Sequence, residues 1–424
     1  MKHLLNSLDT LTRRKFVERC AATSFGLSIL PTTQLVATEP ADQKPAAFGQ
    51  AKSVIWLMLS GGLSHIDSLD PKQGKSKGPA AAINTSAEFQ VTDFFPKFAT
   101  VADRVCLVRS MEAQIGVHKP AQYYMRTAYE PRGTIQHPNL GAWGSHYLGR
   151  SSRTLPSNVC VNRRSDQGNG FFPSSYAPLA IGDPSHGIND VVSIGGKSAA
   201  TKRLTLLNGL DGDFRRKFND KRVNAYNGFY DDALALMKST ELEAFDLSNE
   251  SEEQRAAYGE NSFGQGCLLA RRLVGSGVRF VEVNHGGWDH HKALADEMGN
   301  VAPVFDRAFT TLINDLEQRG ILDSTLVVVA TEFGRKPDFD GGGRSHHPIC
   351  FSTVLAGGGA KAGFVYGKSD DRGYHVEENA VSIGAFHASI AFAAGMEIEK
   401  PAISPSGRPM TVGDGEEPVL ELFA

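Results

Sequence analysis

The chain has 424 residues, of which 41% are hydrophobic, 21% charged and 9% aromatic, and its formal net charge is -3. This length suits one large domain with a substantial insertion, and the composition is that of an ordinary globular protein. The sequence contains no long basic block, so it lacks the electrostatic footprint of a nucleic-acid-binding protein.

The first 45 residues predict an export signal followed by a linker. Arg13 and Arg14 precede Phe16 and the modestly apolar run AATSFGLSILPTTQLVA, a pattern typical of twin-arginine signals. Thr, Ser, Gly and Pro interrupt this run, so we expect no stable membrane span; the alternative is an amphipathic first helix. We therefore expect a periplasmic or extracellular protein whose domain covers residues 46–424.

Beyond the signal, short apolar runs alternate with amphipathic helical patterns. This alternation predicts an α/β fold with a mainly parallel central sheet and helices on both faces. Helices are predicted at 267–274 and about 304–316, and the predicted strands are SVIWLML, RVCLVRSM, VRFVEVN, TLVVVAT and CFSTVLAGGG. Residues from about 130 to 250 are less periodic and rich in Gly, Pro, Asn and Ser, which predicts an irregular insertion or cap.

Potential metal ligands follow most of the predicted strands. Asp67 follows the first strand, and later strands lead into HGGWDHH, EFGRKPD and GGGRSHHP. Ligands of open parallel sheets bind beyond the carboxyl ends of the strands. A mixed carboxylate and imidazole set favours zinc, manganese or iron over calcium. We therefore predict one or two divalent ions, zinc or manganese, with Asp289 and His291 as the strongest ligand candidates.

Other histidines and the cysteines have simpler explanations. Isolated histidines are more often hydrogen-bonded loop residues than ligands, and we expect this of His65, His137, His146, His186 and His375. His285 and His290 are expected to support the ligands rather than to bind metal. The cysteines show no CxxC spacing, which argues against a thiolate zinc site.

Several long motifs occur in a fixed order after the twin-arginine pattern: LSGGLSHIDSLDPK, GGWDHH, TEFGRKP, GGRSHHP, LAGGGAKAGFVYG and FHASIAFAAGM. They resemble the domain-of-unknown-function family DUF1501, from about residue 10 to the C-terminus. More remotely, the chain resembles the alkaline phosphatase and sulfatase superfamily, whose members place one or two metal ions at the carboxyl edge of a parallel sheet. The resemblance implies an alkaline-phosphatase-like three-layer sandwich.

The resemblance also implies a set of metal ligands. Asp289 and His291 match the aspartate and histidine of the family pattern GGWDTH. Glu332 falls where the superfamily has a metal-binding aspartate, and His346 matches the histidine of GGRDHW. Asp67 matches the family's aspartate after the first strand. The implied ligands are therefore Asp67, Asp289, His291, Glu332 and His346.

The chain departs from these patterns at three places. Ser345 and His347 replace the aspartate and tryptophan of GGRDHW, and Ser60 stands where phosphatases have a carboxylate directly after the first strand. The segment HKPAQYYMRTA resembles the sulfatase segment CxPSRxxLLTG, with His118 at the position of the modified cysteine. Because His118 cannot become formylglycine, an ordinary sulfatase mechanism is excluded there under this alignment.

The role of His118 stays open at this point. It suits a metal ligand, a general acid or base, a covalent phosphoryl acceptor, or a hydrogen-bonded cap of the following helix. A water activated by a bound cation is the simpler nucleophile. Arg335 suits a clamp on an anionic substrate oxygen, and its alternative is a surface or carboxylate-paired arginine.

These features predict an exported metal-dependent hydrolase of phosphate or sulfate esters, acting on an anionic small molecule or a polysaccharide ester. The competing hypothesis is a catalytically inactive, metal-stabilised binding protein for an extracellular polymer or partner protein. The missing serine or cysteine nucleophile and the serine at position 345 favour this second hypothesis. A phosphomutase would require a serine or threonine acceptor that the pattern does not place.

Overall fold

The computed structural model describes one compact unit that begins at Pro45. The predicted export signal therefore lies outside the described residues, except for its last position. Among the described helices, none is long and apolar enough to cross a membrane. The described ranges are 45–163, 168–188, 202–203, 205–206, 209 and 232–424.

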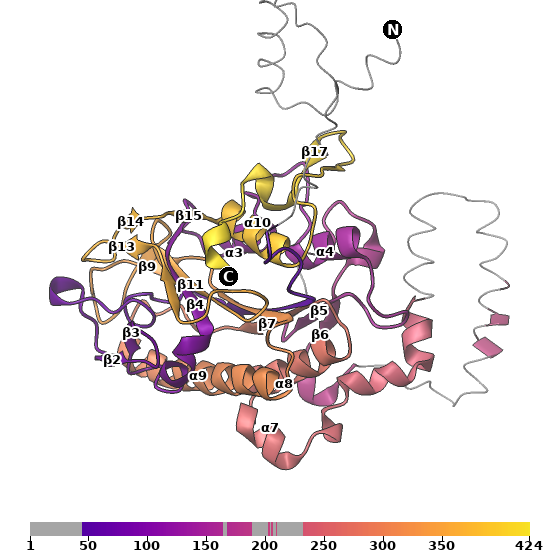
Figure 1. The fold of residues 1–424 in the computed structure, drawn as a ribbon, viewed down its shortest axis with the longest axis horizontal. Helices are drawn as coiled ribbons and strands as arrows, with labels where there is room; N and C mark the ends of the chain where they lie inside the picture. The colour runs from indigo at the N-terminus through magenta and orange to yellow at the C-terminus, as the bar shows by residue number, and fades with distance from the viewer. Residues whose placement is uncertain (1–44, 164–167, 189–201, 204, 207–208, 210–231) are drawn as a thin grey trace, which may run out of the picture. The chain divides into compact units, whose positions relative to one another are not determined.

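The centre of the described unit is a nine-stranded sheet (Figure 1). Its strands are β1 (Ser53–Leu59), β4 (Val105–Glu112), β5 (Asn158–Val161), β6 (Leu179–Ile181), β7 (Phe280–His285), β8 (Thr325–Ala330), β11 (Phe351–Ala356), β12 (Phe364–Tyr366) and β15 (Val381–Ser382). Their order is β12-β4-β11-β8-β1-β7-β5-β6, with β15 paired to β4. Only the pairs made by β11 are antiparallel within this sheet of described strands, so the expected mainly parallel sheet is confirmed.

Helices cover both faces of the sheet (Figure 1). On one face lie α8 (Ser262–Gly275) and α9 (Leu294–Gln318), with α7 (Glu252–Tyr258) packed outside them. On the other face lie α3 (His118–Thr127), α4 (Leu140–Leu148) and α10 (Ile383–Ala393). Both predicted helices are confirmed as parts of α8 and α9, and the expected three-layer α/β sandwich is confirmed.

β1 shows why the central strands are continuous apolar runs. All seven of its residues are buried. Ile55 and Leu57 belong to the hydrophobic core that α8 and α9 complete, whereas Trp56 and Met58 belong to the core completed by α4 and α10. Successive side chains of a strand point to opposite faces, so a strand covered on both sides requires apolar residues at every position.

The region from about 130 to 250 contributes to the sheet itself. β5 pairs with β7, and β6 pairs with β5, both in parallel. These residues belong to the central layer and not to an added cap, in contrast to the expectation for this part of the region. Such short strands carry too few residues to show a period in the sequence. Much of the remaining predicted insertion, from 189 to 231, lies outside the described residues.

Three adjacent strands end at one edge of the sheet. Leu59 of β1 is in register with His285 of β7, and Met58 is in register with Ala330 of β8. Since these strands are parallel, the segments that follow them leave from the same edge. Two short strands complete the framework: β9 (Gly334–Arg335) pairs with β10 (His346–His347), which sets His346 opposite Arg335. The remaining short strand pairs are β2 (Ala82–Asn84) with β3 (Gln90–Thr92), β13 (Lys368–Ser369) with β14 (Val376–Glu378), and β16 (Ala402–Ile403) with β17 (Pro409–Met410).

Candidate metal centre

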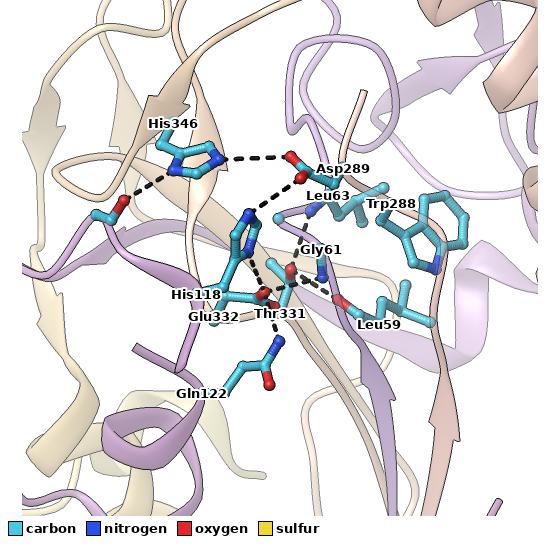
Figure 2. A network of polar contacts seen from close by, with 12 residues as sticks. Leu59, Gly61, Leu63, His118, Gln122, Trp288, Asp289, Thr331, Glu332 and His346 are labelled. Atoms are coloured by element: carbon cyan, nitrogen blue, oxygen red, sulfur yellow. Dashed lines mark hydrogen bonds and ion pairs between the residues drawn. The ribbon is translucent and has the colours of Figure 1, made fainter. Parts of the chain in front are cut away.

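Three side chains converge at this edge of the sheet: His118, Asp289 and His346 (Figure 2). Each offers one potential ligand atom, and these atoms lie within 4.8 Å of one another. His118 Nε2 is 3.2 Å from Asp289 Oδ2, and His346 Nε2 is 3.4 Å from Asp289 Oδ1. His118 is the first residue of α3, so the start of this helix lies beside the segments that carry Asp289 and His346.

His291 lies beside this cluster. Its Nε2 is 2.9 Å from His346 Nε2 and 3.1 Å from Asp289 Oδ1. The side chain of His291 is 47% exposed and that of Asp289 is 46% exposed, so they form the open side of the cluster. The neighbouring His290 is instead buried, and its Nε2 lies 2.8 Å from the Gly287 carbonyl oxygen.

Glu332 lies behind His118 and is not among the three converging groups. Its Oε1 accepts hydrogen bonds from His118 Nδ1 at 2.9 Å, Gln122 Nε2 at 3.0 Å and the Gly61 backbone N–H at 2.9 Å (Figure 2). A carboxylate that holds one imidazole nitrogen orients the other nitrogen, which is the usual arrangement behind a metal-binding histidine. The contacts of Glu332 are thus those of a supporting residue, whereas the sequence predicted a direct ligand.

The charges of these groups follow from their contacts. The hydrogen bond with Glu332 raises the pKa of His118. Burial alone would raise the pKa of Glu332, but the hydrogen bonds from His118 and Gln122 outweigh burial and lower this pKa. Partial burial would also raise the pKa of Asp289, but the hydrogen bond and the positive charge of Arg335 outweigh burial and lower this pKa to about 2. Both carboxyl groups are therefore ionised at neutral pH.

His346 has its free nitrogen directed into the cluster. Its Nδ1 lies 2.8 Å from the Gly116 carbonyl oxygen, and a carbonyl can only accept, so Nδ1 carries the proton. Burial lowers the pKa of His346, which favours the neutral ring. A neutral imidazole protonated on Nδ1 keeps the electron pair on Nε2, the state in which histidine binds a metal.

The residues present fit a divalent cation. His118 Nε2 is buried and makes no hydrogen bond, because its contact with Asp289 lacks hydrogen-bond geometry. A buried polar atom without a hydrogen bond is a place at which an ion or a water binds. Three imidazole nitrogens and one carboxylate are donors that suit zinc, manganese or iron.

Asp67 has an arginine partner where the sequence predicted a metal. The Arg344 guanidinium donates to it twice, from Nε at 2.6 Å and from Nη2 at 3.1 Å, and the Ser64 hydroxyl also donates to it. Both charged side chains of this pair are fully buried. The structure therefore brings Asp289, His291 and His346 together with His118 but leaves Asp67 in a separate ion pair.

Arg335 is buried, in contrast to the predicted clamp on a substrate. Its Nε donates to the Gly62 carbonyl at 2.8 Å, and Nη1 donates to the Arg344 carbonyl at 3.0 Å. Its Nη2 donates to Asp289 Oδ1 at 2.5 Å and also to the Gly61 carbonyl. These contacts match the alternative of a carboxylate-paired arginine, and they hold Asp289 in place.

Three of the histidines that were expected to be hydrogen-bonded loop residues make their contacts outside the cluster. His65 contacts the Gly373 carbonyl at 2.8 Å, and His137 contacts the Tyr123 hydroxyl at 2.8 Å. His186 forms an exposed contact with Asp183 at 2.9 Å. For these three residues the expectation of hydrogen-bonded histidines is confirmed.

Comparison with known sequences decides the family. The sequence model described as "Protein of unknown function (DUF1501)" matches residues 51–423. The chain belongs to the DUF1501 family. No curated protein matches this DUF1501 chain in sequence.

Three solved structures similar to the DUF1501 chain have low sequence identity to it. A sulfatase from Pseudoalteromonas sp. has 12% identity and a TM-score of 0.43, with 88% of this chain and 72% of that chain covered. A lipoteichoic acid synthase from Listeria monocytogenes has 9% identity and a TM-score of 0.40, covering 84% and 75%. A phosphonate monoester hydrolase from Silicibacter pomeroyi has 11% identity and a TM-score of 0.33, covering 82% and 74%.

Some residues around the DUF1501 site were not predicted from the sequence. Gln122 lies four residues after His118, so both face the same side of α3, and this spacing was an available signal. Gly61 adopts a φ of +128°, and a Cβ at this position would lie 2.6 Å from the Asp289 backbone nitrogen. The SGG motif thus marks a close approach between two strand-end segments.

Proposed function

We propose that this DUF1501 protein is a metal-dependent hydrolase of phosphate or sulfate esters that is exported by the twin-arginine route to the periplasm or the cell exterior. The observation that carries the proposal is the convergence of His118, Asp289 and His346, with a buried His118 nitrogen that makes no hydrogen bond. When bound there, a divalent cation supplies Lewis acidity and lowers the pKa of a coordinated water. Zinc and manganese suit this donor set.

The surrounding residues prepare the donors before a cation binds. Glu332 keeps the proton of His118 on Nδ1, and the Gly116 carbonyl does the same for His346. Arg335 fixes the carboxylate of Asp289 through Oδ1. In this proposal His118 is a ligand, and water takes the part that a serine or cysteine side chain plays in other ester hydrolases.

The substrate proposed for this site is anionic, either a small molecule or a polysaccharide ester. Asp289 and His291 are about half exposed, so the donors face solvent on one side. Phosphate and sulfate oxygens are hard ligands that a divalent cation binds well. The ester group would therefore approach from the side of His291.

The second candidate is a metal-stabilised binding protein without catalytic activity. The observation in its favour is the burial of Arg335, whose donors contact backbone carbonyls and Asp289 and do not face the open side. The histidine at position 118, where the resemblance to sulfatases implies a nucleophile, also favours this second candidate. Such a protein would bind an extracellular polymer or a partner protein and would still require the metal for stability.

A substrate panel distinguishes the two candidates. Protein stripped with a chelator and then reloaded with zinc or manganese is assayed on an aryl phosphate, a phosphodiester and an aryl sulfate. We expect hydrolysis that depends on added metal and falls by about a hundredfold or more in His346→Ala and Asp289→Asn. His375→Ala removes an exposed histidine outside the cluster and is the matched control. Bound metal without any hydrolysis would support the binding protein, and hydrolysis that withstands chelation would contradict both candidates.

A further inference from the structure

The turn between β9 and β10 carries an exposed aromatic side chain, Phe339, which is 45% exposed. In the part of the chain that the structure describes, no other phenylalanine, tyrosine or tryptophan is exposed. Exposed apolar side chains that occur singly are common on protein surfaces. The surroundings of this ring therefore decide what it can bind.

The ring of Phe339 lies against a buried arginine. The Arg344 Cζ atom is 5.5 Å from the centre of the ring, which is the distance of a cation–π contact. Arg344 is fully buried, and besides its bonds to Asp67 it donates to the Pro337 and Ser76 carbonyl oxygens. Because these bonds fix the guanidinium, the ring has a rigid support and nearly half of the residue is still exposed.

The turn formed by residues 339–343 lies directly against the segment that carries His291. The Leu294 N–H donates to the Gly342 carbonyl at 2.8 Å. A Cβ at Gly343 would lie 2.2 Å from the backbone carbonyl carbon of His291, so only glycine allows this close approach. The exposed ring is thus on a turn that contacts the open side of the candidate metal centre.

Charged side chains flank the ring on both sides in the sequence. Asp338 accepts from Arg372 Nη2 at 2.5 Å, and the two side chains are 65% and 50% exposed. Asp340, on the other side of Phe339, is also exposed. Carboxylate oxygens accept hydrogen bonds and a guanidinium donates them, so this rim can bind hydroxyl groups, which do both.

A single ring with a charged rim suits a sugar better than a protein. Protein interfaces have an apolar centre and bury about 800 Å² on each partner. A sugar ring is much smaller: its C–H groups form an apolar face, which packs on the negative face of an aromatic ring, and its hydroxyls lie at the edge. Phe339 and its charged neighbours offer both kinds of contact.

We infer that Phe339 is the platform of a sugar-binding subsite beside the candidate metal centre, and that the substrate is an ester carried by a polysaccharide. This inference rests on the proposed hydrolase function and specifies its substrate class. One sugar unit stacks on Phe339, with its hydroxyls bound by Asp338, Asp340 and Arg372. A neighbouring unit presents its ester group at the side of His291.

An array of polysaccharides tests the subsite on the full chain. The array carries sulfated, phosphorylated and unsubstituted polysaccharides, and binding is read at about 0.3 M salt, which screens contacts between exposed charges. We expect the wild type to bind at least one anionic polysaccharide and Phe339→Ala to lose about tenfold or more in affinity for it. Phe339→Tyr keeps the ring and is expected to bind as the wild type does. Leu420→Ala removes an exposed apolar side chain outside the turn and is the matched control.

The outcomes separate the subsite from the proposed function. Absence of binding to every polysaccharide, or equal affinity of the wild type and Phe339→Ala, would overturn the inference, even where sugar-free aryl esters are hydrolysed with added metal. Binding that depends on Phe339 in a protein that hydrolyses no ester would support the subsite and contradict the hydrolase. Circular dichroism checks the fold of Phe339→Ala; if this variant does not fold, unchanged affinity in Asp338→Ala would still overturn the inference.

Discussion

Glu332 and His118 illustrate, at the scale of single residues, how a buried carboxylate orients a candidate ligand. Glu332 is fully buried yet ionised, since its hydrogen bonds with His118 and Gln122 outweigh the effect of burial on its pKa. The negative charge holds a proton on His118 Nδ1 and leaves Nε2 directed at Asp289. The orientation of one imidazole thus depends on a residue that does not itself reach the cluster.

Glu332→Gln tests this relation. Glutamine has nearly the same size but no negative charge, so it holds the His118 ring and its proton less firmly. We expect the affinity for Zn²⁺ to fall about 10- to 100-fold while the fold is retained. Competition with a chromophoric chelator measures the affinity, with His375→Ala as the control. An unchanged affinity would show that Glu332 does not act through His118.

Asp67→Asn separates a structural carboxylate from a ligand. It leaves the buried guanidinium of Arg344 without its counter-ion, so we expect a loss of about 3–5 kcal/mol in the free energy of unfolding. The metal content of the folded protein should not change. Denaturant unfolding and elemental analysis measure the two quantities. Loss of metal at unchanged stability would instead make Asp67 a ligand.

At the scale of elements, the turn after β1 brings two strand-end segments together. Gly61 donates its N–H to Glu332, and its α-carbon faces the Trp288–Asp289 backbone. We predict that Gly61→Ala, which adds a Cβ at 2.6 Å from the Asp289 nitrogen, displaces Asp289 and costs about 2 kcal/mol or more in the free energy of unfolding. Metal affinity should fall with it. Gly133→Ala is the matched control, because a Cβ there meets no atom within 4 Å. Equal effects of the two substitutions would contradict this account of the turn.

The helices and strands also show which parts of the fold a local sequence pattern can predict. Long apolar runs and helical spacing were sufficient to predict β1, β4, β7, β8, β11 and the two helices α8 and α9. The antiparallel direction of β11 and the membership of β5 and β6 in the sheet depend on distant pairing partners, which a local pattern does not contain. The strand-end rule likewise located Asp289, His291 and His346. The sequence also predicted Glu332 as a ligand and left the role of His118 open, and the structure places His118 in the cluster because of how α3 packs against the end of β8.

At the scale of the whole molecule, two hydrophobic layers enclose the sheet and also bury histidines away from the site. His387 of α10 is fully buried, and its ring contacts the Met125 carbonyl at 2.7 Å. Burial lowers the pKa of His387 to about 4 and that of His65 to about 4. In the unfolded chain both would titrate near 6.5, so the unfolded state binds more protons between these pH values.

This burial predicts acid lability. The stability associated with neutral His387 is complete above about pH 6.5 and is lost as the pH falls toward 4, by up to about 3 kcal/mol for one such group. His387→Gln retains an amide donor for the Met125 carbonyl but does not titrate. We therefore expect the free energy of unfolding of this variant to depend less on pH between 6.5 and 4 than that of the wild type. Identical pH dependence in the two proteins would contradict the assignment.

Metal content tests the central claim most directly. The full-length protein, purified without a histidine tag, is examined by elemental mass spectrometry beside His346→Ala and the control His375→Ala. We predict that a divalent transition metal is present in the wild type and the control and is lost from His346→Ala. A folded wild type that contains no such metal and takes none up when zinc or manganese is supplied would contradict the metal centre and the function proposed from it.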